Sequence, residues 1–394
     1  MRMDAETLRI MSSVPATESN PYFRLFYSAL RPHRVELVGT FEPTRRWLRE
    51  NRDTFDVLHF HWPEWIIRSE PDWLRSIQNR SGGWRISQLL RPTATWARVH
   101  EYREFLKGAR ECGKVIAWTC HNVQPHDGAT WPVRAAYRSL ARSADLVICH
   151  DPAASDQCRA LYAPPGRVVV MEHGNYDGVY APARSKDEIL REVGLQPGVP
   201  LLISVGHIRS YKGTDLVCEA AARLGNRVAL LIAGATPIAS YARRIKELVQ
   251  RLPNAGFVDR HLTEQEFADF VGASDIVLLP YRSITGSGVA LAALTLGRGL
   301  IASDLPFFVD LLRGHPSAGR VFATGEAGSM SDAILAFLQI PAAEREKAAR
   351  DLAARFDWGR LVPPVAWNLR DLVADKLGHV ASDVVREDHA GQPG

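Results

Sequence analysis

The sequence has little of what would mark a disulfide-stabilised, zinc-binding or membrane-spanning protein. Its 394 residues include only five cysteines, an odd number with no Cys-x-x-Cys pair, so we predict neither a disulfide framework nor a zinc site. No run of about 18 consecutive apolar residues occurs, and the first residues lack the apolar segment of a signal peptide. We therefore expect a cytoplasmic protein that can lie on a membrane but does not cross it.

Neither sign of charge is in large excess. The 48 basic and 44 acidic residues give a formal net charge of +4. Such a balance suits anionic substrates or anionic lipid, but it is weak for a nucleic-acid-binding protein. We therefore expect no nucleic-acid partner.

Short β-branched runs alternate with amphipathic stretches along the whole chain, the pattern typical of parallel sheets covered by helices. The predicted strands form two series of six. They are 8–12, 35–38, 57–60, 115–119, 146–149 and 168–171, then 201–205, 228–233, 255–258, 276–279, 300–302 and 321–323. The fold class predicted is α/β, with two doubly wound, Rossmann-like domains facing each other across a cleft.

The Gly- and Pro-rich stretch between the two series predicts an interdomain linker. We place the first domain at 1–176, the linker at 177–200, the second domain at 201–380 and a flexible tail at 381–394. A ligand is expected at the carboxyl ends of the strands.

Two basic residues three positions apart follow the first strand of the second series. Arg209 can bind two phosphate oxygens at once, Lys212 adds a point charge, and Gly206 and Gly213 allow tight turns around them. A solvated loop that happens to be basic is the alternative. The position directly after a buried strand favours a phosphate site.

Tyr281 to Gly288 is the expected partner element. Thr285 and Gly286 precede Ser287 and Gly288, where a helix is predicted to begin. Free backbone N–H groups and the helix dipole favour a doubly charged anion there. Ser and Gly also cap many helices that bind nothing. Together with the two cations, this element indicates a site for a nucleoside diphosphate.

The second half resembles the donor domain of GT-B glycosyltransferases. The similarity is to the large retaining family typified by sucrose synthases and bacterial mannosyltransferases, and to related enzymes of exopolysaccharide assembly. It runs through VGHIRSYKG at 205–213, LIAG at 231–234, ASDIVLLP at 273–280 and LAALTLGRGLIAS at 291–303. The resemblance implies that Arg209 and Lys212 neutralise the leaving diphosphate, and that the 286–288 turn donates backbone N–H groups to it.

One feature departs from the family pattern. The family usually has two glutamates where this chain has Ile284 and Ala292, and no carboxylate lies between Asp275 and Asp304. Recognition of the ribose must therefore differ, and retention of the sugar's configuration does not carry over. We favour inversion over retention. No Asp-x-Asp motif is present and two cations already face the phosphates, so we expect neither a metal ion nor a cofactor.

Polar residues end several strands of the first half. An inverting transfer needs a general base for the acceptor hydroxyl, and the resemblance extends to HWPE and HN-x-x-PH strings of bacterial polysaccharide glycosyltransferases. Structural hydrogen bonding is the common alternative for each residue. The candidates for the base are Glu64, His126 and Asp127, and the candidates for substrate contacts are Asn20, His61, His121 and Tyr281. The resemblance implies that the segment Glu172 to Asn175 can lie close to the donor, but we interpret it as a turn before the linker.

Residues 65–110 combine four tryptophans with nine basic and four acidic residues. Such a composition suits docking to an anionic membrane surface, and an ordinary amphipathic helix pair is the alternative.

We therefore expect a glycosyltransferase that moves a hexose from a GDP- or UDP-sugar, with GDP-mannose favoured, to a lipid-linked saccharide in bacterial surface polysaccharide synthesis. It would act as a peripheral protein on the inner face of the cell membrane. A nucleotide-sugar epimerase of the same fold and a non-catalytic nucleotide-sugar-binding protein are the alternatives.

Overall fold

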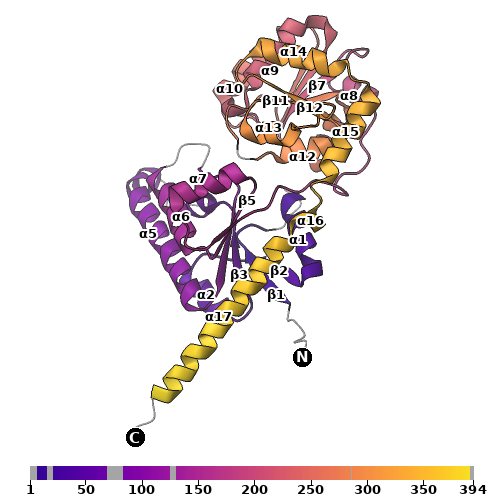
Figure 1. Cartoon of the computed structure of the whole chain (residues 1–394). Helices are drawn as coiled ribbons and strands as arrows, with labels where there is room; N and C mark the ends of the chain where they lie inside the picture. Colours follow the sequence, from indigo (N-terminus) through magenta and orange to yellow (C-terminus); the bar gives the residue numbers. More distant parts are fainter. Residues whose placement is uncertain (1–6, 16–20, 69–82, 125–129, 285, 391–394) are drawn as a thin grey trace. The chain divides into compact units, whose positions relative to one another are not determined.

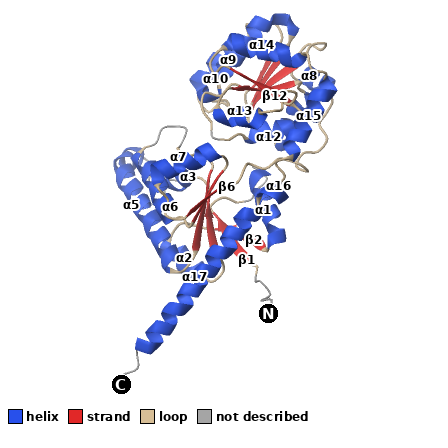
Figure 2. Ribbon diagram, in the orientation of Figure 1, coloured by secondary structure: helices blue, strands red, loops and turns tan. Residues whose placement is uncertain are grey.

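The computed structural model describes residues 7–15, 21–68, 83–124, 130–284 and 286–390. The chain divides into two compact units, each built around a parallel sheet (Figures 1 and 2). The first unit consists of 1–17, 23–172 and 359–394, and the second of 18–22 and 173–358. Within the described residues, no helix has the length and apolar character needed to cross a bilayer.

The sheet of the first unit has the strand order β2-β1-β3-β4-β5-β6, all parallel. The central strands β3, β4 and β5 are buried at every position, as expected where helices cover both faces of a parallel sheet. The strands are β1 Leu8–Ser12, β2 Val35–Thr40, β3 Val57–Phe60, β4 Val115–Cys120, β5 Leu146–Cys149 and β6 Arg167–Val170.

Helices α5 and α6 lie against one face of this sheet, and α17 runs along the other (Figure 1). The core beneath α5 and α6 is rich in aromatic rings, including the fully buried Phe105 and Trp118. The helices of this unit are α1 Pro21–Leu30, which begins in the second unit, α2 Arg45–Asn51, α3 Pro63–Arg68, α5 Gly83–Glu111, α6 Trp131–Ser143, α7 Pro152–Tyr162 and α17 Pro363–Ala390, with the 3-10 turn Arg31–His33.

The second sheet has the order β12-β11-β10-β7-β8-β9, again all parallel. Its strands are β7 Leu201–Val205, β8 Ala229–Ala233, β9 Ala255–Val258, β10 Ile276–Leu279, β11 Gly299–Ser303 and β12 Gly319–Phe322. Its helices are α8 Lys186–Glu192, α9 Thr214–Leu224, α10 Ala239–Val249, α11 Glu264–Ala273, α12 Gly288–Thr295, α13 Pro306–Leu312, α14 Ala327–Leu338, α15 Ala342–Ala354 and, at the boundary of the units, α16 Trp358–Leu361, with 3-10 turns at Ser210–Lys212 and Gly225–Arg227.

Each sheet has a point where the winding direction reverses, between β1 and β3 in the first and between β7 and β10 in the second. Loops that leave the carboxyl ends of two such strands diverge and leave room for a ligand. The motifs at Gly206 and Tyr281 follow β7 and β10, and the HWPE motif follows β3. The expected α/β fold class with two doubly wound, Rossmann-like sheets is confirmed, and every predicted strand overlaps an observed one.

The structure differs from the expected boundaries near the C-terminus. The predicted second domain extends to residue 380, whereas α17 belongs to the first unit. Its Lys376 ammonium bonds the Asp145 carboxylate at 2.7 Å, and Arg167 binds Asp371 at 2.5 Å. Residues 381–390, expected to be a flexible tail, continue the same helix. The predicted linker contains α8, whose capping box on Ser185 starts the helix.

Candidate functional site

The loops after β7 and β10 in the second unit carry the predicted phosphate site. Gly206 has φ +98°, a left-handed conformation that glycine tolerates best. A Cβ placed on it would lie 3.4 Å from the Lys212 Nζ and 3.6 Å from the Val289 Cγ2. Because Val289 is in the first turn of α12, the Lys212 ammonium and the start of that helix both lie beside the Gly206 backbone.

The Lys212 ammonium is held in place by its surroundings. Its Nζ lies 5.4 Å from the centre of the Tyr281 ring, a cation–π distance. Burial lowers the pKa of Lys212, and the nearby Arg209 charge lowers it further. The two cations are therefore close enough to repel each other, and an anion bound between them would relieve that repulsion.

The start of α12 is capped by Ser287, and two polar side chains approach it closely. Ser287 is the N-cap, and its side chain accepts a hydrogen bond from the Ala290 backbone N–H at 3.2 Å. A Cβ on Gly288 would lie 2.6 Å from the Tyr176 hydroxyl and 3.5 Å from the His173 Nε2. The segment Glu172–Asn175, which we interpreted as a turn, thus places His173 at this helix start, and Tyr176 follows directly after the segment. The resemblance allowed a donor contact by this segment, but the spacing of the two residues in the sequence did not indicate their approach to α12.

Two residues that the sequence analysis missed join the two loops. Arg282 binds both carboxylate oxygens of Asp215, at 3.0 and 3.1 Å, and also donates to the Ser210 backbone carbonyl. Its own backbone N–H donates to the Tyr211 carbonyl at 2.7 Å. Asp215 is buried in the first turn of α9 and is also bonded by Arg244 at 3.3 Å. This clamp fixes the loop that carries Lys212 against the loop that leads to α12.

Of the predicted donor residues, the structure describes all except Thr285. The contacts described above bring together Gly206, Lys212, Tyr281 and the Ser287–Gly288 turn. Gly213 serves as the N-cap of α9, and its φ of +68° brings its backbone against the Pro280 carbonyl.

In the first unit, four histidines and a tyrosine form a hydrogen-bonded chain across the carboxyl ends of β3, β4 and β5. The links are His59 Nε2 to Thr119 Oγ1 at 2.8 Å, His59 Nδ1 to Tyr27 Oη at 2.8 Å, Tyr27 Oη to His61 Nε2 at 3.0 Å, His61 Nδ1 to His121 Nε2 at 3.0 Å, and His121 Nδ1 to His150 Nε2 at 3.3 Å. We call it the histidine chain.

When the rings are neutral, the contact of His150 at the end of the histidine chain determines where each proton of the chain lies. His150 Nδ1 lies 3.0 Å from the Met171 carbonyl oxygen, which only accepts, so this nitrogen carries the hydrogen. Its Nε2 must then accept a hydrogen bond from His121 Nδ1–H. In the same way, His121 Nε2 accepts from His61 Nδ1–H. The Tyr27 hydroxyl donates to His61 and accepts from His59, whose other nitrogen accepts from Thr119.

Burial disfavours the charged form of three of these rings. It lowers the pKa of His59 to about 3 and lowers the pKa of His61 and of His150 as well. His121 is half-buried and stacks on Trp62 with ring centroids 4.4 Å apart. The predicted contact residues His61 and His121 are thus adjacent links, whereas Tyr27, His59 and His150 were not foreseen.

Glu64, a candidate for the general base, lies in the first turn of α3 and is buried. The Tyr137 hydroxyl donates to its Oε2 at 2.8 Å, and burial together with this carboxylate raises the pKa of Tyr137. Asn20, His126 and Asp127 lie outside the described residues.

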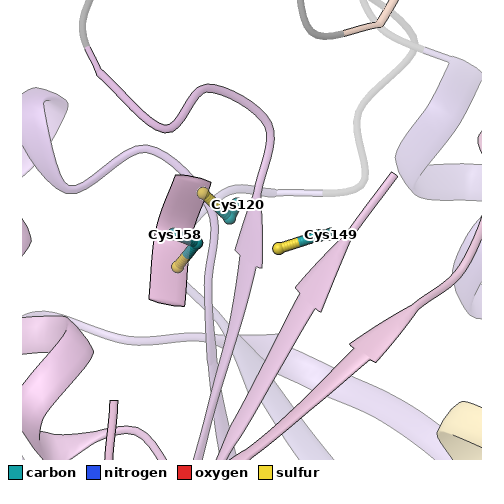
Figure 3. A group of neighbouring side chains, drawn as sticks. All are labelled: Cys120, Cys149 and Cys158. Atoms are coloured by element: carbon teal, nitrogen blue, oxygen red, sulfur yellow. The ribbon is translucent and has the colours of Figure 1, made fainter. Parts of the chain in front are cut away.

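Three cysteines converge in the core of the first unit, which their spacing in the sequence did not suggest. The Sγ atoms of Cys120, Cys149 and Cys158 lie within 4.8 Å of one another, on β4, β5 and α7 (Figure 3). Three thiolates would suit a soft metal ion. All three are buried within the apolar core, however, so we interpret them as small packing residues.

Comparisons with known proteins place these sites in context. Residues 199–339 match the family model described as Glycosyl transferases group 1. The chain is 25% identical over 361 residues to GDP-mannose:glycolipid 4-beta-D-mannosyltransferase of Xanthomonas campestris pv. campestris, an alignment that covers 90% of this chain and 89% of the relative. It is 28% identical over 235 residues, 57% of this chain and 62% of the relative, to a lipopolysaccharide core biosynthesis mannosyltransferase of Rhizobium meliloti.

Solved structures agree on the fold. Sucrose-phosphate synthase from Thermosynechococcus elongatus superposes with a TM-score of 0.68 at 16% identity, covering 93% of this chain and all of that one. HepE of Anabaena, solved in complex with UDP, gives a TM-score of 0.60 at 13% identity, covering 95% of this chain and all of that one.

Proposed function

We propose that this chain, a glycosyltransferase of the GT-B fold, transfers a hexose from a nucleoside diphosphate sugar to a lipid-linked saccharide during synthesis of a bacterial surface polysaccharide. GDP-mannose is the preferred donor in this proposal. The main structural support for the proposed transfer is that the Lys212 ammonium lies beside the start of α12. The Xanthomonas relative, which aligns over 90% of the chain, is named for GDP-mannose and a glycolipid.

The chemistry follows from charge. Departure of the sugar leaves negative charge on the diphosphate, and Arg209, Lys212 and the free N–H groups of α12 would stabilise it. The Asp215–Arg282 clamp positions the loop before the substrate arrives, so little reorganisation accompanies the reaction. In this proposal the two cations supply the positive charge, and no metal ion is required.

We propose inversion at the sugar carbon. The two family glutamates are replaced by Ile284 and Ala292. The name of the Xanthomonas relative specifies a β-D-mannosyl product, which an α-linked sugar nucleotide yields by inversion. The acceptor hydroxyl then needs a base, for which Glu64, His126 and Asp127 remain the candidates. Anomeric analysis of the product tests this step.

The donor site can be tested by binding and turnover. In a thermal-shift screen of GDP- and UDP-sugars, the true donor should raise the midpoint because it binds only the folded protein. Arg209→Ala and Lys212→Ala should each lower turnover at least tenfold. Arg243→Ala, which removes an exposed cation of α10, is the matched control and should leave turnover unchanged.

The outcomes separate the alternatives. Near-normal turnover in Arg209→Ala and Lys212→Ala would contradict the proposed donor site. Conversion of the sugar nucleotide without an acceptor would favour an epimerase. Binding without transfer, unaffected by Glu64→Gln and by substitution of His126 and Asp127, would favour a non-catalytic binding protein.

A further inference from the structure

Helices α5 and α6 of the first unit enclose a cationic groove. It consists of two adjoining cavities of about 470 Å³ and about 330 Å³, which share Arg103, Ser139 and Arg142 in their walls. We call this feature the α5–α6 groove. Its basic residues are Arg103, Lys107 and Arg110 from α5 and Arg134, Arg138 and Arg142 from α6.

Helical spacing gathers these side chains into two facing rows. Arg134, Arg138 and Arg142 are four residues apart, so they project from one face of α6. Arg103 and Lys107 have the same spacing on α5, and both are exposed. The Arg103 Nε donates to Ser139 Oγ across the groove at 3.1 Å. The two rows therefore form one surface.

This positive charge has little internal compensation. Within the part of the chain that the structure describes, no carboxylate pairs with Arg134, Arg138 or Arg142. Glu111 is the acid in the lining, and it lies 3.7 Å from the Lys107 Nζ. Like charges at helical spacing repel one another. An anionic partner would remove that cost, and arginine binds phosphate oxygens in pairs.

Two exposed tryptophans stand at one end of the groove. The Trp96 side chain is 61% exposed and Trp131 is 48% exposed, and their ring centroids lie 5.4 Å apart. Trp96 precedes Arg103 by two helical turns, and Trp131 borders the larger cavity. Large exposed indole rings beside arginines are characteristic of the headgroup region of a bilayer.

We propose that the α5–α6 groove docks the enzyme on an anionic phospholipid bilayer. The arginines would contact lipid phosphates, and the Trp96–Trp131 pair would enter the interface beside them. From the sequence we expect docking through residues 65–110, and in the structure α6 forms a second wall of the groove. Docking would bring the first unit to a lipid-linked acceptor. The docking proposal itself depends on the charges and aromatic rings of the groove and not on the proposed function.

Vesicle flotation tests the proposal with the full-length protein. We expect binding to vesicles that contain phosphatidylglycerol and little binding to pure phosphatidylcholine, with the bound fraction falling as salt rises. The triple variant Arg134→Ala, Arg138→Ala, Arg142→Ala should bind roughly a hundredfold more weakly, at about fivefold per arginine. A matched control, Arg46→Ala, Arg49→Ala, Arg52→Ala, removes the same charge from another surface and should bind as the parent does.

A second variant tests the aromatic contribution. Trp96→Ala with Trp131→Ala should reduce the blue shift of tryptophan emission on vesicle addition and lower binding. Equal loss in the two arginine variants would overturn the proposal, as would equal binding to neutral vesicles. Binding to heparin without binding to vesicles would do the same, because it would indicate a soluble polyanion or an acidic protein as the partner.

A water-soluble acceptor analogue separates this proposal from the proposed function. Transfer to such an analogue should be unchanged in the arginine triple variant, since the groove contributes only docking. If the parent protein binds vesicles through the groove but transfers no sugar to any acceptor, the proposed function fails and the docking surface stands.

Discussion

Lowering the pH from about 7.5 to about 5 should loosen the first unit, because its buried histidines stay neutral while the unfolded chain takes up protons. Burial depresses the pKa of His59 from 6.5 to about 3. Its contribution to stability is therefore complete above about pH 6.5 and is lost as the pH falls from there toward 3. At pH 5 the loss for this one ring is about 2 kcal/mol. The lowered pKa values of His61 and His150 act in the same direction.

Hydrogen exchange of the β3 and β4 amides, corrected for intrinsic rates, measures this change within the first unit. We expect protection to fall at least thirtyfold between the two pH values, the equivalent of about 2 kcal/mol. His59→Asn should remove about that share of the pH dependence, whatever its effect on absolute stability. His100→Asn changes an exposed histidine of α5 and is the control. Protection that stays constant down to pH 5 would refute the argument, since it would mean that the folded rings accept protons freely.

Three further predictions concern single features. Gly206→Ala places a methyl group 3.4 Å from the Lys212 Nζ on a backbone with φ +98°, so donor affinity measured by calorimetry should fall at least tenfold. Asp215→Asn removes the charged partner of Arg282 and should lower both the melting temperature and kcat/KM, with an unchanged kcat/KM counting against the clamp. In the native protein a thiol reagent should modify only Cys112, the exposed cysteine, and all five thiols should react after denaturation. Rapid reaction of Cys120 would show that its core position is wrong.

The fold was predictable to a large extent, because buried parallel strands are continuous apolar runs that loops and amphipathic helices interrupt. The run at 276–279 is one example, and α9 is an amphipathic helix of the kind expected between two such strands. The unit to which α17 belongs could not be predicted. The apolar face of α17 must pack against one of the two sheets, but periodicity does not indicate which. Its packing on the first sheet depends on ion pairs such as Lys376 with Asp145.

The same contrast separates the two sites. Gly206 and Lys212 could be proposed from the sequence because a short turn keeps them near each other and after one strand. The histidine chain depends on β3, β4 and β5 being neighbours, so its members are 60 and 29 positions apart in the sequence. Its proton order further requires the Met171 carbonyl, a backbone group that carries no sequence signature at all. The Asp215–Arg282 clamp was missed for the same reason, since it joins loops 67 positions apart.

The two cationic surfaces differ in a way that fits different tasks. Lys212 lies against Tyr281, and burial lowers its pKa, so its charge is costly until a phosphate is present. Such a group favours tight and selective binding of one small dianion. Arg138 and Arg142 are exposed and arginine keeps its charge at any physiological pH, so many weak and interchangeable phosphate contacts suit them better. Raising the pH would therefore weaken donor binding before it weakened docking, because the lowered pKa of Lys212 lets it lose its proton first, whereas the arginines of the groove keep theirs.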